Sequence, residues 1–213
     1  MTKEKLARIE MIKGVDATSP KMAHNGDVGT DLFTAEDVVI PPTLLSAPLV
    51  TTDLKLAFNE EEYGMMITPR SGILNWPLIL SNCVGIVEGT YRGSVGMAFH
   101  NIYSGPIGVM PFALTLNPET KEMEQVPLEN ISAGALTKAK ERYSKELNIM
   151  NMGIKEESEL FVSSLPNGTV FIPKGTRLVQ AFLFNKVDSD WVPVGALSDT
   201  VRGTGGFGSS GTK

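Results

Sequence analysis

The segment YGMMITPRSG, Tyr63 to Gly72, contains the two features on which a fold assignment for this chain depends. Its first part, Tyr63 to Thr68, is typical of a short strand, and the turn TPRSG ends that strand. In the turn, an Arg and a Ser hydroxyl stand beside Gly72, a residue that lets the backbone approach a ligand closely. These donors suit phosphate oxygens, but a polar turn that stabilises a buried corner has the same composition. The segment therefore predicts a strand that ends in a candidate phosphate site.

The same pattern of a short strand followed by a turn recurs along the chain. The further predicted strands are Val38 to Ile40, Leu54 to Phe58, Val95 to Asn101, Thr169 to Ile172 and Leu178 to Phe184. Together with 21 Gly and 13 Pro, they favour a mainly β architecture.

One stretch departs from this pattern. Residues Ile131 to Met150 are rich in helix formers, with apolar residues at three- and four-residue spacings. Ser132 is a suitable N-cap, so a helix is predicted near 132–148. Such a helix either packs on the domain as an appendage or binds a partner protein.

Size and composition exclude several classes of protein. The 213 residues, 42% of them hydrophobic, suit one domain, or one domain with a large insertion. A net charge of -5 disfavours nucleic-acid binding. The apolar stretches are shorter than the roughly 20 residues that span a bilayer, and the start lacks the apolar core of a secretory signal. With the single Cys83, no intrachain disulfide is expected, and the expected location is the cytoplasm, or the host cytoplasm if the protein is viral.

Four other segments carry candidate chemistry. They are GDVGTDLFTA from Gly26, NCVGIVEGTYRG from Asn82, KGTRLVQAFLF from Lys174 and RGTGGFGSSG from Arg202. The last has glycines that offer backbone N–H donors at close range and a Phe that offers a flat face to a base. It is no Walker loop, because the Gly-Lys-Ser/Thr ending is missing.

Together with TPRSG, these segments resemble the five motifs of the trimeric dUTP pyrophosphatases (dUTPases), in the family's order, over roughly residues 22–103 and 168–211. The resemblance implies a jelly-roll-like β-barrel. The region 104–167, with the predicted helix, then looks like an insertion in a surface loop, and 202–213 like a flexible arm. Loop insertions of this size have a modest entropic cost.

The resemblance also implies roles for individual residues. Arg70 and Ser71 would grip the triphosphate, Glu88 would activate the attacking water, and Asp31 would touch a Mg²⁺ ion through water. Arg177 is expected to brace the scaffold by pairing with Asp31. The remaining residues implied to bind substrate are Asn82, Gly85, Val87, Tyr91, Gln180, Arg202, Phe207, Gly208, Ser209 and Ser210.

The implied reaction is attack of water on the α-phosphorus of dUTP, which gives dUMP and pyrophosphate with Mg²⁺ on the triphosphate. The implied assembly is a homotrimer whose sites are shared between subunits. The family usually has Asp where this chain has Glu88. The extra methylene moves the carboxylate by roughly 1 to 1.5 Å, and about 1 Å of misplacement can cost on the order of a hundredfold in rate. Whether Glu88 supports full activity stays open at this point.

Two alternatives remain beside the dUTPase. One is dCTP deamination, since that group shares the fold, although the complete RGTGGFGSSG tail disfavours it. The other is a nucleotide-binding regulatory protein with weak or no catalysis that acts on a partner through the insertion. A zinc-dependent deaminase is excluded, because Cys83 alone cannot supply its ligand set.

Overall fold

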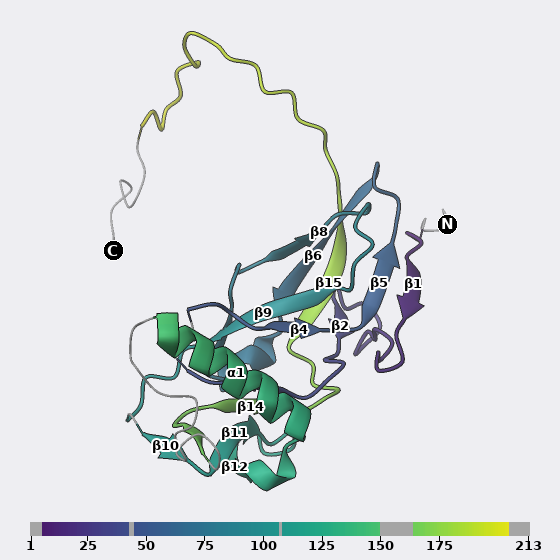
Figure 1. Ribbon diagram of the computed structural model, residues 1–213. Helices are drawn as coiled ribbons and strands as arrows, with labels where there is room; N and C mark the ends of the chain where they lie inside the picture. The colour runs from purple at the N-terminus through teal and green to yellow at the C-terminus, as the bar shows by residue number, and fades with distance from the viewer. Residues whose placement is uncertain (1–5, 43–44, 107, 150–163, 205–213) are drawn as a thin grey trace.

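The computed structural model describes residues 6–42, 45–106, 108–149 and 164–204 (Figure 1). Within these ranges the fold is mainly β, with the α-helix α1 (Ala133–Ile149) and the short 3-10 helices η1 (Ser71–Asn75) and η2 (Leu128–Asn130). The strands are β1 (Glu10–Lys13), β2 (Thr30–Leu32), β3 (Val38–Ile40), β4 (Leu49–Thr51), β5 (Leu54–Ala57), β6 (Tyr63–Pro69), β7 (Leu78–Leu80), β8 (Gly85–Val87), β9 (Gly96–Asn101), β10 (Val109–Met110), β11 (Phe112–Leu116), β12 (Met123–Pro127), β13 (Leu165–Pro166), β14 (Val170–Ile172) and β15 (Val179–Asn185).

These strands pair into several small sheets. Two have four strands, in the orders β2-β15-β6-β8 and β12-β11-β14-β3, and a third has the order β4-β9-β7. Two further pairs are β1 with β5 and β10 with β13. In Figure 1 the β2-β15-β6-β8 sheet occupies the upper part of the body, while α1 and β10 to β14 form the lower part.

All six predicted strands are present. The prediction Val38 to Ile40 coincides with β3. Four others differ from β5, β6, β9 and β14 by one residue at one end, and Leu178 to Phe184 is shifted by one residue from β15 at both ends. The predicted helix near 132–148 is α1, and Ser132 directly precedes it. No helix among the described residues is long and apolar enough to cross a membrane.

The region between the third and fourth motifs contains more than the predicted helix. It also forms the antiparallel hairpin β11–β12, which was not predicted, with Leu114 opposite Gln125. Strand β11 then runs parallel to β14, with Leu114 opposite Val170. The segment therefore extends a sheet of the barrel and does not stand apart from it.

Strands β3 and β14 are buried on both faces. Val38, Ile40, Val170 and Ile172 pack in the main core of the barrel. The residues between them in sequence, Val39 and Phe171, point the other way, into a second core. Alternate residues of a strand face opposite sides of a sheet, so two short strands contribute to two cores.

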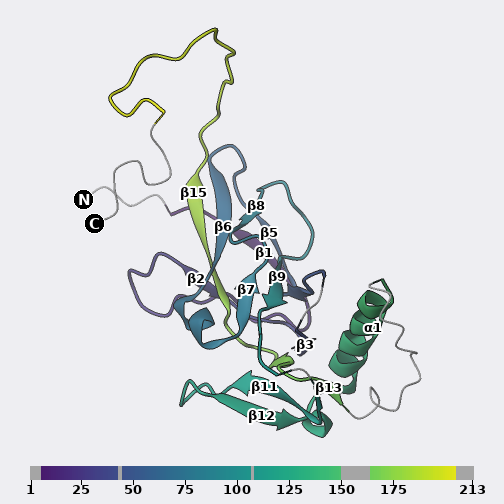
Figure 2. The ribbon, with the colours of Figure 1, turned by 90° about the vertical axis from the view of Figure 1, so that its left-hand side faces the viewer.

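Helix α1 covers the second core. Ala135 and Ala139, one turn apart on the helix, pack there together with Ile131, Ala113 and Leu165. Figure 2 shows α1 beside the lower sheet, away from β8 and β15. The inserted elements therefore close over the outer faces of β3 and β14 and leave the barrel core as it is.

Candidate functional site

The first group of predicted site residues lies across three neighbouring strands. Gln180 of β15 is directly opposite Asp31 of β2 on one side and Thr68 of β6 on the other. Arg70 follows two residues after Thr68, and its backbone N–H donates to the carbonyl of Leu178 at 2.9 Å. Three separate motifs thus meet at one edge of the β2-β15-β6-β8 sheet.

The carboxylate of Asp31 binds two arginines. Arg70 Nε lies 2.5 Å from Asp31 Oδ1, and Arg177 Nη1 lies 3.2 Å from Asp31 Oδ2. Asp31 is only 4% exposed, so its charge is compensated almost wholly by these two cations. The predicted pairing of Arg177 with Asp31 is confirmed. Asp31 also fixes the side chain of Arg70, the residue expected to grip phosphate.

A cavity of about 300 Å³ opens beside this group. Its lining includes Asp31, Arg70 and Gln180 and, in addition, His24 and Asp27, which the sequence analysis did not select. Asp27 Oδ2 accepts the backbone N–H of His24 at 2.8 Å and lies 3.5 Å from His24 Nδ1. The signal in the sequence was the Asp three residues after the His, a spacing at which an Asp side chain closes a turn.

Gln180 lies against the backbone of Gly29. A Cβ at Gly29 would come 2.4 Å from Gln180 Oε1, which is closer than atoms can approach. Gly29 is therefore a glycine because the glutamine side chain occupies the space where its own side chain would be. This contact fixes Gln180 at the wall of the cavity.

Ser71 is the first residue of η1, directly after Arg70, and it is exposed. The helix starts from an extended Arg70 with φ -78° and ψ 157°. The Ser71 side chain is accordingly next to the Arg70 backbone at the end of β6, as the motif TPRSG suggested.

The second group of predicted residues lies on the hairpin around β8. Strand β8 pairs with β6, with Gly85 opposite Ile67 and Val87 opposite Met65. Asn82 is exposed before the hairpin, and Glu88 is exposed after it. Tyr91, 48% exposed, belongs to the same turn as Glu88, because its backbone N–H donates to the Glu88 carbonyl at 3.0 Å.

Glu88 and Arg70 stand at opposite ends of β6, whereas Gly85 is opposite Ile67, near the Arg70 end. Glu88 continues β8 past Val87, which is opposite Met65, whereas Arg70 lies beyond the other end of β6. At roughly 3.3 Å per residue, the backbones of Glu88 and Arg70 are about 20 Å apart along the strand. The cavity with Arg70 and Gln180 has neither Glu88 nor Tyr91 in its lining.

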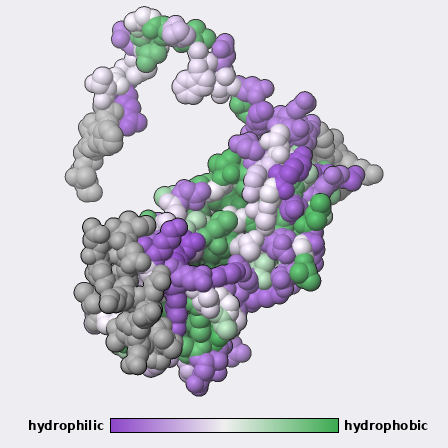
Figure 3. All heavy atoms as spheres, in the orientation of Figure 1, coloured by the Kyte–Doolittle hydropathy of each residue, from purple (hydrophilic) through white to green (hydrophobic). Residues whose placement is uncertain are grey.

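The C-terminal tail leaves the barrel after β15. Residues 186–204 run away from the body in both ribbon views (Figure 1, Figure 2). Apolar side chains on this tail are exposed, as the space-filling view shows (Figure 3); they include Val187, Trp191, Val192, Val194, Leu197 and Val201. Arg202 belongs to this tail. The predicted site residues Phe207, Gly208, Ser209 and Ser210 lie outside the described residues.

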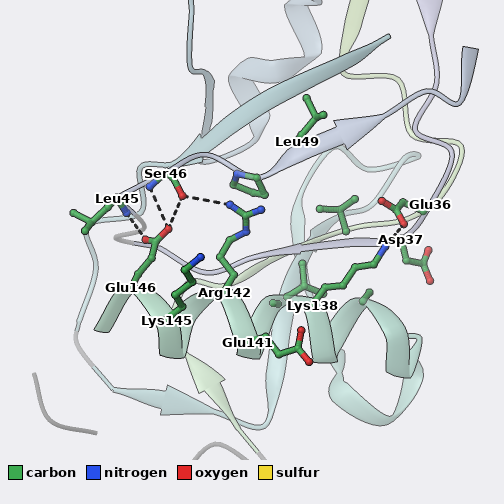
Figure 4. A pocket seen from close by; sticks show the side chains of 15 residues that line it. Glu36, Asp37, Leu45, Ser46, Leu49, Lys138, Glu141, Arg142, Lys145 and Glu146 are labelled. Atoms are coloured by element: carbon green, nitrogen blue, oxygen red, sulfur yellow. Dashed lines mark hydrogen bonds and ion pairs between the residues drawn. The ribbon is translucent and has the colours of Figure 1, made fainter. Parts of the chain in front are cut away.

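A cavity of about 600 Å³ lies elsewhere, between α1 and residues 45–49 (Figure 4). Glu146 of α1 accepts hydrogen bonds there from the backbone N–H groups of Leu45 and Ser46 and from the Ser46 hydroxyl. Lys138 Nζ pairs with Glu36 Oε2 at 2.6 Å. None of the predicted site residues lines this cavity, which belongs to the interface between α1 and the barrel.

Metal ligands are sparse in the part of the chain that the structure describes. No group of three or more His, Cys, Asp or Glu side chains gathers there. The carboxylates of Asp27 and Asp31 nevertheless line the cavity beside Arg70. This donor set fits an ion that keeps most of its waters and needs few protein ligands, as Mg²⁺ does.

Comparison with known sequences gives a consistent picture. A family model described as dUTPase matches residues 16–110. A deoxyuridine 5'-triphosphate nucleotidohydrolase of Clostridium kluyveri is 30% identical over 117 residues, which are 54% of this chain and 76% of the relative. The enzyme of the same name from Thermobifida fusca is 27% identical over 92% of this chain and 74% of its own length. The Mycobacterium marinum enzyme of this name is 38% identical, over 39% of this chain and 53% of the relative.

Several solved phage proteins share this fold. The dUTPase of Staphylococcus bacteriophage 80alpha with dUPNHPP superposes with a TM-score of 0.69 at 22% identity, over 96% of this chain and 99% of that one. A mutant dUTPase of phage phi11 of S. aureus, described with a structural Mg(II) ion, gives a TM-score of 0.63 at 19% identity, over 90% and 99%. At these identities the likeness concerns the fold, and it confirms the jelly-roll-like architecture expected from the motifs.

Proposed function

The chain belongs to the dUTPase family, and from this membership we propose that it hydrolyses dUTP to dUMP and pyrophosphate. The observation that carries the proposal is the row Asp31, Gln180 and Thr68 across three strands, which places Arg70 at the wall of a cavity. Arg70 and Gln180 are donors suited to phosphate oxygens. They come from two motifs far apart in the sequence, so the fold itself assembles this part of the site.

The reaction is attack of a water oxygen on the α-phosphorus. Glu88 takes the proton of that water as a general base, and the bond from the α-phosphorus to the bridging oxygen breaks, so that pyrophosphate leaves. Arg70 and Arg202 neutralise the charge of the triphosphate, and Ser71 donates a hydrogen bond to it, a mainly electrostatic contribution to the transition state. Mg²⁺, when bound, supplies further charge neutralisation on the phosphate oxygens. Asp27 and Asp31 would accept hydrogen bonds from its waters.

The nucleoside is held by the β8 hairpin and the C-terminal arm. Backbone groups of Gly85 and Val87, with Asn82, recognise uracil, and Tyr91 lies flat against the deoxyribose. Phe207 stacks over the base, while Gly208, Ser209 and Ser210 close over the phosphates. An exposed Tyr ring and a Phe among glycines are suited to such apolar faces.

The active site is shared between copies of the chain in a homotrimer. This is supported by the separation of about 20 Å between Glu88 and Arg70, too large for both side chains to act on one phosphorus. It is also supported by the tail that contains Arg202, since residues 186–204 run away from the barrel of their own chain. Activity should therefore fall when the protein is diluted below the dissociation constant of the assembly.

Pyrophosphate release from dUTP, with dTTP, dCTP and UTP as controls, tests this function. Release selective for dUTP is expected, and Glu88→Gln should lower kcat by on the order of 10² to 10⁴, the usual contribution of a general base. Glu88→Asp restores the shorter side chain usual in the family, so an increase in kcat would mean that Glu88 is misplaced. Selective release from dCTP with ammonia as a product would instead establish a deaminase.

A second candidate is regulation of a partner protein through the insertion. It is favoured by α1, whose outer side is polar, and by the likeness of almost the whole chain to phage dUTPases that are described as controlling transfer of virulence genes by a G protein-like mechanism. Deletion of 132–148 would leave dUTP hydrolysis intact and abolish regulation under this candidate. A deletion variant that loses dUTP hydrolysis but still regulates the partner protein would count against this candidate.

A further inference from the structure

A short chain of hydrogen bonds links β4 to the turn that carries Tyr91. Tyr91 donates its hydroxyl to the Ser94 carbonyl at 3.2 Å. The Ser94 hydroxyl lies 2.9 Å from that of Thr51, at the end of β4. Thr51 Oγ1 also accepts the backbone N–H of Asp53 at 3.0 Å. Thr51 and Ser94 thus stand directly behind the tyrosine.

The Tyr91 ring is additionally held against Gly93. A Cβ at Gly93 would lie 2.2 Å from the Tyr91 hydroxyl oxygen and 2.4 Å from Cζ. The ring therefore rests on its own chain at the hydroxyl end, while about half of the residue, 48%, is open to solvent. A ligand can reach the open part without any movement of the turn.

Thr51 belongs to a rigid frame. It is opposite Gly96 in the β4–β9 pair. The next residue, Thr52, is fully buried and donates both its backbone N–H and its hydroxyl to the Val95 carbonyl, at 3.0 and 2.7 Å. The hydroxyl of Thr51 is thereby fixed in space. Ser94 joins the turn to this frame, since the next residue, Val95, donates its backbone N–H to the Leu54 carbonyl at 2.7 Å.

We propose that Thr51 and Ser94 are positioning residues that set the angle of the Tyr91 ring and, through it, the preference for deoxyribose over ribose. The inference rests on the proposed dUTPase function, in which a ring flat against the sugar leaves no room for a 2′-hydroxyl. Loss of the Thr51 hydroxyl removes the side-chain contact of Ser94 with the frame. The ring can then tilt, and a ribonucleotide gains access.

The same turn carries Glu88, whose carbonyl accepts the backbone N–H of Tyr91. A shift of the turn would therefore change kcat as well as the choice of sugar. The sugar preference is the sharper readout, since a merely structural residue would lower stability without altering the ratio of dUTP to UTP turnover.

The test compares Thr51→Val, which removes the hydroxyl at nearly equal volume, with Thr51→Ser, which keeps it. Thr51→Val should lower the ratio of kcat/KM for dUTP over UTP by about fivefold, the equivalent of one net hydrogen bond. Thr51→Ser should retain the wild-type ratio. The matched control is Thr169→Val, which removes a buried hydroxyl that donates to the Pro166 carbonyl at 2.6 Å and should lower Tm without changing the ratio.

Two outcomes would overturn the inference. One is a folded Thr51→Val variant with the wild-type ratio, and the other is an equal fall of the ratio in Thr169→Val. If the wild-type protein releases no pyrophosphate from dUTP, the proposed function fails separately. Calorimetric affinities for the imido analogues of dUTP and UTP then decide the inference, because they report the sugar preference without turnover.

Discussion

Replacing Asp31 with Asn removes the charge that holds Arg70 and Arg177. The substitution keeps the size of the side chain and one acceptor oxygen, so any effect comes from the charge and the second acceptor. Both arginines remain in place around a group that is now neutral. Because Asp31 is buried, solvent cannot replace the missing charge.

The size of the effect follows from the exposure of the partners. The side chain of Arg70 is 27% exposed, and a hydrogen bond to a charged group in such a setting contributes about 1.5 to 3 kcal/mol. Arg177 is 46% exposed, so its pair is screened and contributes about 0.2 to 1 kcal/mol. Asp31→Asn should therefore destabilise the fold by roughly 2 to 4 kcal/mol, which lowers Tm by about 5 to 15 °C for a chain of this size.

Thermal unfolding of Asp31→Asn and Arg177→Gln measures this difference. Arg177→Gln serves as the matched control, since it removes only the weaker pair and should shift Tm by no more than about 4 °C. Enzyme kinetics should add a rise in KM for dUTP, because Arg70 is no longer held in one orientation. A wild-type Tm and KM for Asp31→Asn would refute the reasoning. If Asp31 acts chiefly on metal-bound water, the Mg²⁺ concentration for half activity would rise while Tm stays unchanged.

Three further substitutions test separate parts of the structure. Gly29→Ala should displace Gln180, since the new Cβ would lie 2.4 Å from its Oε1; calorimetry should report weaker binding of the dUTP imido analogue at nearly unchanged Tm. Thr115→Val should raise Tm by a few degrees, because the buried Thr115 Oγ1 has no hydrogen-bond partner among the described residues and its removal gains about 1 kcal/mol. Glu146→Gln, which replaces the acceptor of two N–H groups and a hydroxyl, should destabilise α1 by about 2 kcal/mol and speed limited proteolysis there, with dUTP turnover retained.

The strands could be predicted where an apolar run is bounded by Gly or Pro, as at Val38 to Ile40 before Pro41 and Pro42. The hairpin β11–β12 was missed although Phe112–Leu116 alternates between half-buried and buried residues, the period of a strand. Its second strand, Met123–Pro127, is largely exposed and carries a weak apolar pattern. Its pairing with β11 depends on tertiary contacts that a local pattern does not contain.

Part of the candidate site could also be predicted from the sequence, and part could not. Arg70, Gln180 and the Asp31–Arg177 pair follow from the motifs, because each motif is a continuous segment of known chemistry. His24 and Asp27 join them only through the fold, which brings residues 23–29 beside β15. The distance between Glu88 and Arg70 is likewise a property of the β6–β8 register, and a linear sequence does not give that register.

The placement of the insertion explains how the chain can carry it without loss of the site. Helix α1 packs on Val39 and Phe171, the outward residues of β3 and β14, so the barrel core keeps its own side chains. One contact of α1 with the barrel is at Ser46, five residues before Thr51 in the sequence. Thr51 is fixed independently by the β4–β9 pair and by the bonds of Thr52 to Val95. The substitutions Glu146→Gln and Thr51→Val should therefore have additive effects on the free energy of unfolding, as expected for residues that share no partner.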